Sequence, residues 1–203
     1  MQDFGWIAEK ERLVEEFGIR PDSPPFPDGA AVRSLDDAVR QLRIFLKRDF
    51  DFNDDWVIES ENWWYIPYGF IGCAGIIMDK LDGYVNALGS CYDLDLYFWA
   101  HNQNIKYEYA DLTVTKVKNL QPTIATLMKM GNRAPLNPIP NKSDSAGNRT
   151  MFLTRENIAE QLANLPVTFA NQSLWFTIGA LKKSFDADDF SFSVKRGSWD
   201  QSP

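Results

Sequence analysis

Three residues in this sequence could supply a nucleophile and its base: Cys73, Cys91 and the single histidine, His101. A thiol acts as a nucleophile when a base lies within hydrogen-bond reach and a third group orients that base. Neither cysteine lies in a recognisable thiol-enzyme signature, and His101 lies in an aromatic stretch where a histidine commonly satisfies a local hydrogen bond. A hydrolase or transferase that uses Cys73 or Cys91 with His101 therefore remains an alternative, and we assign no catalytic residue.

Metal and cofactor sites leave sequence patterns that this chain lacks. A structural zinc site needs four Cys or His ligands, and only three such residues are present. Asp49, Asp51 and Asn53 imitate the first ligands of a helix-loop-helix calcium site, but its glycine and bidentate acid positions hold Asp54 and Ser60. The glycine-rich segment that follows lacks the Gly-Lys-Ser/Thr of a phosphate loop. We therefore expect neither a metal nor a cofactor.

Composition and charge limit the classes of partner. The chain has 203 residues, of which 44% are hydrophobic and 14% aromatic, values typical of a folded protein with an aromatic core. Its 28 acidic and 21 basic residues give a net charge of −7, which opposes binding to nucleic acid and favours a basic protein. Two cysteines make no disulfide framework, and neither a signal peptide nor a membrane span is recognised. We therefore expect a cytoplasmic protein with free thiols.

The candidate residues belong to a central segment, residues 56–99, whose pattern is typical of antiparallel strands. Asp82-Gly83 supplies a tight turn between two apolar β-rich runs, so it predicts a hairpin. The glycines at 69, 72 and 75 permit a bend or a bulge. Strands are predicted at 56–59, 63–67, 75–79, 84–88, within 105–118 and at 190–196, and helices at 6–17, 34–50, within 90–104, at 122–130 and from 154.

The helix at 34–50 has the clearest helical pattern. Its apolar residues recur at helical spacing, Ser34 can cap its first turn, and acidic residues at its start suit the helix dipole. We expect an α+β fold, with a mostly antiparallel sheet packed against helices and a C-terminal helix-and-strand extension. Its parts would be a main domain at 1–131, a Pro/Asn-rich loop at 132–150, and an extension at 151–203 packed on the main domain.

Aromatic and acidic residues form the candidate binding surface. Because side chains alternate along a strand, Trp63, Trp64 and Tyr65 cannot all face one side. The ring that points away from the core is either covered by the C-terminal segment or exposed to a partner. The residues that we predict to bind a partner are Asp51, Asp54, Asp55, Trp63 and Tyr65, with Asp93 and Asp95 as a second group.

The segment from Pro67 to Ser90 also resembles a known family. Trp-rich strands precede Pro-x-Gly, a Gly-rich bend, Ile-Ile-x-Asp-Lys, x-Asp-Gly-x-Val and Leu-Gly-Ser. This order is similar to that of the YrhB-like immunity proteins of bacterial polymorphic toxin systems and, more distantly, to the SUKH superfamily. The resemblance covers about residues 35–90 and implies an α+β protein that neutralises a cognate toxin by binding, without enzymatic activity. It carries over no functional residue.

The sequence thus predicts an immunity protein whose acidic and aromatic surface binds a toxin that is basic at the contact. The composition and the resemblance point in the same direction, toward binding without chemistry. Neither nucleic acid nor a membrane is expected as a partner. Two alternatives stay open: the Cys/His-dependent hydrolase or transferase, and a self-associating structural or interaction protein that forms a homodimer.

Overall fold

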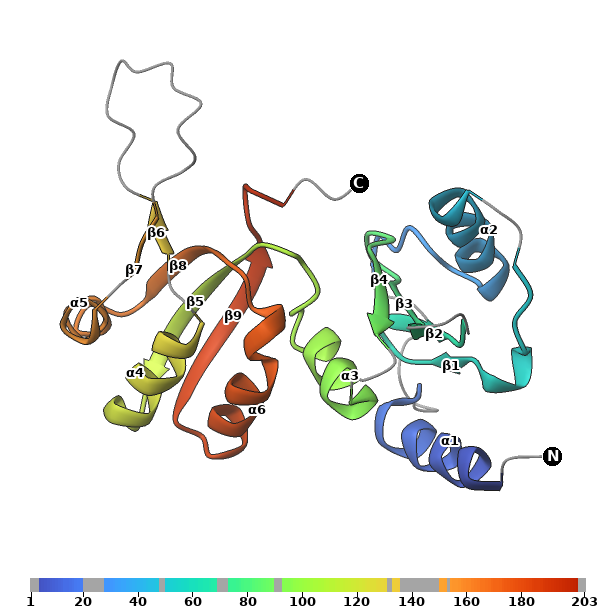
Figure 1. The fold of residues 1–203 in the computed structure, drawn as a ribbon, viewed down its shortest axis with the longest axis horizontal. Helices are drawn as coiled ribbons and strands as arrows, with labels where there is room; N and C mark the ends of the chain where they lie inside the picture. The colour runs from blue at the N-terminus through green and yellow to red at the C-terminus, as the bar shows by residue number, and fades with distance from the viewer. Residues whose placement is uncertain are drawn as a thin grey trace, which may run out of the picture. The chain divides into compact units, whose positions relative to one another are not determined.

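The computed structural model describes residues 4–19, 28–47, 50–68, 73–89, 93–130, 133–135, 150–152 and 154–200. The chain forms two compact units, residues 1–102 and 103–203 (Figure 1). Helices combine with an antiparallel sheet of four strands in the first unit and of three strands in the second, which confirms the α+β fold. Within the described ranges, no helix combines the length and apolar character that a bilayer crossing requires.

The first unit is built on a sheet whose strands follow the order of the sequence, β1-β2-β3-β4, each antiparallel to the next. The predicted hairpin joins β3 to β4, with Gly83 at φ +70° in its turn. A register shift between Cys73 and Gly75 forms a bulge, one of the two features that the glycines were expected to permit. The elements of the first unit are α1 (Phe4–Phe17), α2 (Leu35–Leu46), the 3-10 helix η1 (Asp54–Trp56), β1 (Ile58–Glu59), β2 (Trp63–Ile66), β3 (Cys73–Asp79), β4 (Val85–Gly89) and α3 (Leu94–Asn102).

Helix α2 covers one face of this sheet. The hydroxyl of Ser34 accepts a hydrogen bond from the backbone N–H of Asp37, which confirms the predicted cap, and Lys47 ends the helix in a left-handed conformation. The buried side of α2 packs against alternate residues of β2 and β3, including Trp64 and Met78, which lie opposite each other in the sheet. This layer forms one hydrophobic core of the unit.

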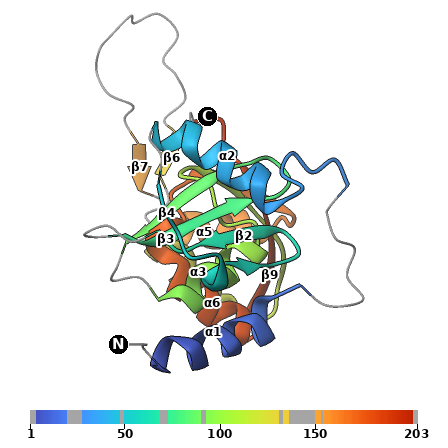
Figure 2. The ribbon, with the colours of Figure 1, turned by 90° about the vertical axis from the view of Figure 1, so that its right-hand side faces the viewer.

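Helices α1 and α3 cover the other face, and Figure 2 shows α1 and α2 on opposite sides of the strands. The ring of Trp63 stacks on Phe98 of α3 with a centroid distance of 4.7 Å, and Tyr65 meets the same ring at 5.2 Å. Phe17 of α1 completes the cluster at 5.5 Å from Phe98. The aromatic side chains that point away from α2 are therefore covered within the first unit by α3 and α1.

The second unit is built on a sheet in the order β8-β5-β9, in which the central strand is antiparallel to both neighbours. Thr154 and Asn157 form a capping box at the start of α5, where the helix was predicted, and β9 matches the predicted alternating strand. The elements of the second unit are β5 (Ala110–Val117), α4 (Leu120–Lys129), β6 (Arg133–Pro135), β7 (Thr150–Phe152), α5 (Arg155–Leu162), β8 (Val167–Gln172), η2 (Trp175–Thr177), α6 (Ile178–Asp186) and β9 (Phe190–Arg196).

The division between the units differs from the expected one. Residues 103–131 were expected in the main domain, but β5 pairs on one side with β8 and on the other with β9. A strand that forms the centre of a sheet cannot belong to another domain than its partners, so the boundary lies at Asn102. Most of the expected 132–150 loop lies outside the described residues, although its ends meet where β6 pairs with β7.

Leu42 and Ile44 of α2 form a matched pair for testing the first core. The side chain of Leu42 is 0% exposed and that of Ile44 is 72% exposed. Leu42→Ala should lower the free energy of unfolding by about 2–5 kcal/mol, because it leaves a cavity between α2 and the sheet. Ile44→Ala should change it by less than about 0.5 kcal/mol. Urea unfolding followed by far-UV circular dichroism measures both, and equal effects would contradict the packing described.

Candidate functional site

A groove of about 350 Å³ opens in the first unit and is the candidate binding site. Among the described residues that line it, four contribute aromatic rings, one is a proline and two are aliphatic, and Asp51 contributes the only carboxyl group. Such a lining suits a ligand that presents a flat or apolar surface and one complementary charge. The lining residues are Asp51, Phe52, Asn53, Trp56, Tyr65, Pro67, Tyr68, Ala74 and Leu94.

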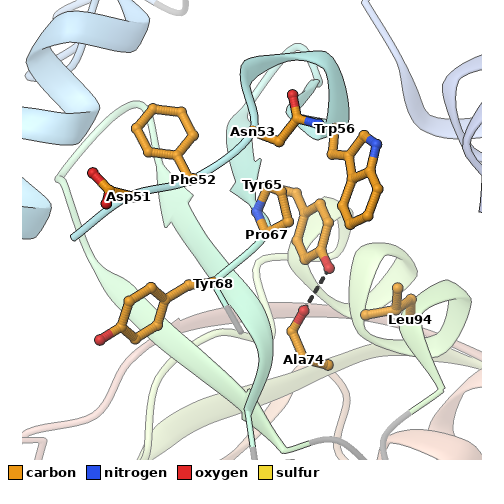
Figure 3. Close-up of a pocket in the computed structure, with 9 residues that line it drawn as sticks. All are labelled: Asp51, Phe52, Asn53, Trp56, Tyr65, Pro67, Tyr68, Ala74 and Leu94. Carbon is orange, nitrogen blue, oxygen red and sulfur yellow. Dashed lines mark hydrogen bonds between the residues drawn. The ribbon is translucent and has the colours of Figure 1, made fainter. Parts of the chain in front are cut away.

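The lining residues form an elongated site. Figure 3 shows Trp56 and Leu94 at one end and Asp51 with Tyr68 at the other, with the ring of Tyr65 between them. Trp56 and the carboxylate of Asp51 thus lie at opposite ends of the groove. A ligand that fills the site must extend along it.

The 3-10 helix η1 presents Trp56 at the groove. The side chain of Asn53 accepts a hydrogen bond of 3.0 Å from the backbone N–H of Asp55, which caps the helix and turns the chain before β1. Lys10 of α1 donates to the backbone carbonyl of Asp55 and ties the turn to that helix. As a result the Trp56 side chain is 41% exposed, whereas the sequence pattern placed it in a strand.

Tyr65 forms the floor of the groove and not a projecting contact. Its side chain is 1% exposed, and its hydroxyl donates a hydrogen bond of 2.8 Å to the carbonyl of Ala74. The ring crosses β3 where Gly75 has no side chain, and a Cβ at Gly75 would lie 2.4 Å from the Tyr65 ring. Gly75 therefore permits the close approach that gives the groove its flat aromatic floor.

The other predicted binding aromatic, Trp63, lies in the core. It is 0% exposed, and its indole N–H donates to Asn102 Oδ1 at 2.8 Å. Trp63 therefore joins β2 to α3 and does not form the surface expected of it. The reason is that α3 returns to the sheet and stacks Phe98 on it, a long-range contact that the local pattern does not contain.

The segments that carry the two predicted acidic groups both contribute residues to the groove. Asp51 lines it, and Asp54 and Asp55 immediately precede Trp56. Asp93 and Asp95 flank Leu94 at the start of α3. The structure thus brings the two acidic segments to one groove, through Asp51, Trp56 and Leu94, which line it.

Asp95 is already engaged within the unit. Its carboxylate accepts a hydrogen bond of 2.6 Å from Arg12 of α1, which also pairs with Glu9 and Glu16. Hydrogen bonding to Glu9, and then to Asp95, raises the pKa of Arg12, and the Arg12 hydrogen bond lowers the pKa of Glu9. A lowered Glu9 pKa means that this carboxylate favours folding above its unfolded pKa and loses that effect as the pH falls through its folded pKa. Asp95 therefore holds α3 to α1.

Sequence reasoning predicted Asp51 and Tyr65 but missed the other seven described lining residues: Phe52, Asn53, Trp56, Pro67, Tyr68, Ala74 and Leu94. One local signal was present, because Asn53 followed by two acids is a common start of a short helix and would have taken Trp56 out of the strand. The placement of Tyr68 and Leu94 depends on contacts between distant segments. No local pattern predicts them.

The candidate nucleophile and base are described only in part. His101 is 3% exposed, and its Nε2 lies 3.1 Å from the side-chain nitrogen of Asn86 in β4. Cys91 and the side chain of Cys73 lie outside the described residues. Among the residues that the structure describes, no group of three His, Cys, Asp or Glu side chains is placed to hold a metal ion. Asp49, the first residue of the calcium-like pattern, is also outside them.

A double-mutant cycle between Gly75 and Tyr65 tests the groove floor. Gly75→Ala should lower the free energy of unfolding by about 1–3 kcal/mol, because the new Cβ overlaps the Tyr65 ring. In a Tyr65→Leu background the same change should cost less, with a coupling energy of about 0.5–3 kcal/mol. Gly29→Ala is the control, since a Cβ at that position meets nothing within 4 Å. The cost of Gly29→Ala in unfolding free energy comes from the positive φ alone and should be the same with and without the Tyr65→Leu change. If the effects of Gly75→Ala and Tyr65→Leu simply add, the contact between Gly75 and the Tyr65 ring is contradicted.

Comparison with known proteins gives no match, whether with family models, with curated proteins or with solved structures. The resemblance to immunity proteins therefore stands only on the motif between Pro67 and Ser90. That motif overlaps the floor of the groove but not its Trp56 end. The function of the groove must be argued from its own geometry and charge.

Proposed function

We propose that this chain is an immunity protein that binds a cognate bacterial toxin in the cytoplasm and neutralises it by covering the toxin's active site. The observation that carries the proposal is the groove, whose aromatic lining has the half-exposed ring of Trp56 at one end and the carboxylate of Asp51 at the other. Large aromatic side chains that are accessible beside a concave surface are typical anchors of protein interfaces. The inhibitor itself needs no chemistry.

The distribution of charge between the two units supports a basic partner more strongly than the net charge of the whole chain does. Residues 1–102 contain 19 acidic and 9 basic side chains, a net charge of −10, whereas residues 103–203 contain 9 acidic and 12 basic side chains, a net charge of +3. The groove lies wholly within the acidic unit. A field of this sign accelerates association with a positively charged surface and repels acidic competitors.

The aromatic and acidic parts of the site would contribute in different ways. Covering Trp56 removes apolar surface from water and slows dissociation, because a central, desolvated aromatic ring carries much of the binding free energy. Exposed carboxylates of the same unit, such as those of Asp51 and Asp54, are screened by salt and mainly change the association rate. An inhibitor of this kind binds quickly at low salt and remains bound through its aromatic anchor.

Self-association is the second candidate, and one observation favours it. Ile44 and Phe45 are neighbouring large apolar side chains on α2 that are exposed in the isolated chain. A homodimer through α2 would cover them and leave the groove unused. Light scattering of the purified chain separates the candidates, since a dimer that Ile44→Lys converts to a monomer supports self-association.

Trp56 provides the test of the inhibitor function. The tagged full chain is used to capture a partner from its native lysate, and the purified pair is then measured by titration calorimetry at about 0.05 M and about 0.5 M salt. We expect a stoichiometric complex that salt weakens, and an affinity loss of at least about tenfold on Trp56→Ala. The same variant should lose its ability to protect cells that express the captured toxin.

Glu61→Gln is the matched control, because Glu61 is an exposed acid of the same unit that does not line the groove. This variant should bind and protect as the unchanged protein does. A captured protein that is not toxic, or toxicity that persists when the complex has formed, would overturn the immunity function. An unchanged affinity of Trp56→Ala would remove the groove from the mechanism.

A further inference from the structure

We propose that the groove receives an extended, proline-rich segment of the partner, with prolines along its aromatic lining and a basic residue at the Asp51 end. This inference rests on the proposed function, whose binding site it specifies. Its starting point is the elongated form of the groove, in which the ring of Tyr65 lies between Trp56 at one end and Asp51 at the other. A ligand that fits must be apolar along its length and positively charged where it meets Asp51.

The aromatic lining is supported by the core of the unit. The ring of Phe50, which is 8% exposed, lies 5.6 Å from the ring of Phe52 and 5.3 Å from that of Tyr68, as centroid distances. At the other end the side chain of Trp56 is 41% exposed and lies beside the buried ring of Tyr65 (Figure 3). The groove therefore presents rings along its length that are in place before a ligand binds, which reduces the entropy lost on binding.

The strands beneath the groove exclude a ligand that adds to the sheet. Tyr65 of β2 lies opposite Ile58 of β1 on one side and opposite Ile77 of β3 on the other. Strand addition requires an exposed sheet edge, and β2 is a central strand. An extended ligand in the groove must therefore be held by side chains and not by a ladder of backbone hydrogen bonds.

The size of the groove also disfavours a helical ligand. An α-helix with its side chains is about 10–12 Å across. The groove has a volume of about 350 Å³, which is at the small end for ligand sites. A thin, extended segment fits this space better than a helix does.

A polyproline II segment meets these conditions. It is extended and has no internal hydrogen bonds, so its backbone carbonyls can accept hydrogen bonds from side chains. Asn53 lines the groove, and its Oδ1 accepts from the backbone N–H of Asp55, so its amide nitrogen is the group that it can offer to a ligand carbonyl. Aromatic-lined grooves recognise proline-rich segments in this way, because these segments are ordered before they bind.

The charge of the site gives the ligand a direction. Because Asp51 and Trp56 lie at opposite ends, a basic residue that meets Asp51 is separated by the length of the groove from the prolines that meet Trp56. The net charge of −10 on the first unit attracts a segment of this kind. The basic residue should thus lie at one end of the proline-rich segment and not within it.

Short blocked peptides test this inference on the full chain. The reference peptide has about seven residues, which span about 22 Å in a polyproline II helix, with prolines at most positions and one arginine at an end. It is made with the arginine at either end, and the tighter binder serves as the reference. One comparison peptide has alanine in place of every proline. Another has citrulline, which has the shape of arginine without its charge.

Binding is followed by NMR through the indole N–H signal of Trp56, which Trp56→Phe identifies. We expect the reference peptide to bind with a dissociation constant of about 0.1–1 mM and the alanine peptide at least about tenfold more weakly. The citrulline peptide should bind about threefold more weakly at low salt, and this difference should vanish at about 0.5 M salt.

A spin label at either end of the reference peptide tests its orientation. The label at the proline end should broaden the indole N–H signal of Trp56 more strongly than the label at the arginine end does. The opposite order would place the basic residue at Trp56 and overturn the inference.

Variants of the chain separate the aromatic contribution from the acidic one. Trp56→Ala should weaken binding of the reference peptide at least about tenfold, with an unchanged circular dichroism spectrum. Asp51→Asn should remove the difference between the arginine and citrulline peptides and keep the preference for proline over alanine. Glu61→Gln should change neither preference.

Three results would overturn the inference on the ligand: equal affinity for the proline and alanine peptides, tighter binding of a helix-forming peptide, or no saturable binding of the reference peptide. A dimer of the chain that Trp56→Ala dissociates, seen by light scattering, would assign the groove to a second copy and overturn it as well.

The outcomes also distinguish this inference from the proposed function. Proline-dependent binding at Trp56 in a chain that neutralises no toxin would keep the groove assignment and overturn the immunity function. Neutralisation of a toxin with the same affinity in Trp56→Ala would do the reverse. Proline-dependent binding together with loss of protection in that variant supports both.

Discussion

The first unit depends on the burial of one strand from both sides. Successive side chains of β2 point to opposite faces, so Trp63, Trp64 and Tyr65 require apolar cover above and below the sheet. Helix α2 supplies it on one side, and α3 with α1 supplies it on the other. Because both faces are covered, the connections around the strands, and not the sheet itself, present the surface that a partner can reach.

This constraint explains where the groove lies. The segment between α2 and β1 must pass the edge of the covered sheet, and it does so through Phe52 and the short helix that ends at Trp56. Tyr65 reaches the groove only because Gly75 lets its ring cross β3. The groove is therefore supported by β2, the same strand that organises the core.

Local patterns were sufficient for the parts of the fold that local interactions determine. The Ser34 cap, the start of a helix at Thr154, the Asp82-Gly83 hairpin and the β9 strand are each determined within a few residues, and each was predicted. The unit boundary was not, because β5 finds both of its partners far along the chain. The covering of Trp63 by Phe98 has the same origin, and so does the presence of Asp51 and Leu94 in the lining of one groove. Composition pointed to acids and aromatics, but only the packing separated the core Trp63 from the accessible Trp56.

The separation of Trp63 from Trp56 also separates stability from binding. Trp63 and Phe98 are fully buried and hold β2 and α3 together, so a partner does not reach them. Trp56 lies in a capped 3-10 helix and is 41% exposed, so a partner can reach it. The excess of acidic residues in the same unit opposes compactness through mutual repulsion, and pairs such as Arg12 with Asp95 offset only part of it. An excess of acids in the unit that exposes this indole is costly for an isolated fold and useful for one that meets a cationic surface. A basic partner would relieve that repulsion when it binds, so its binding should also stabilise the unit.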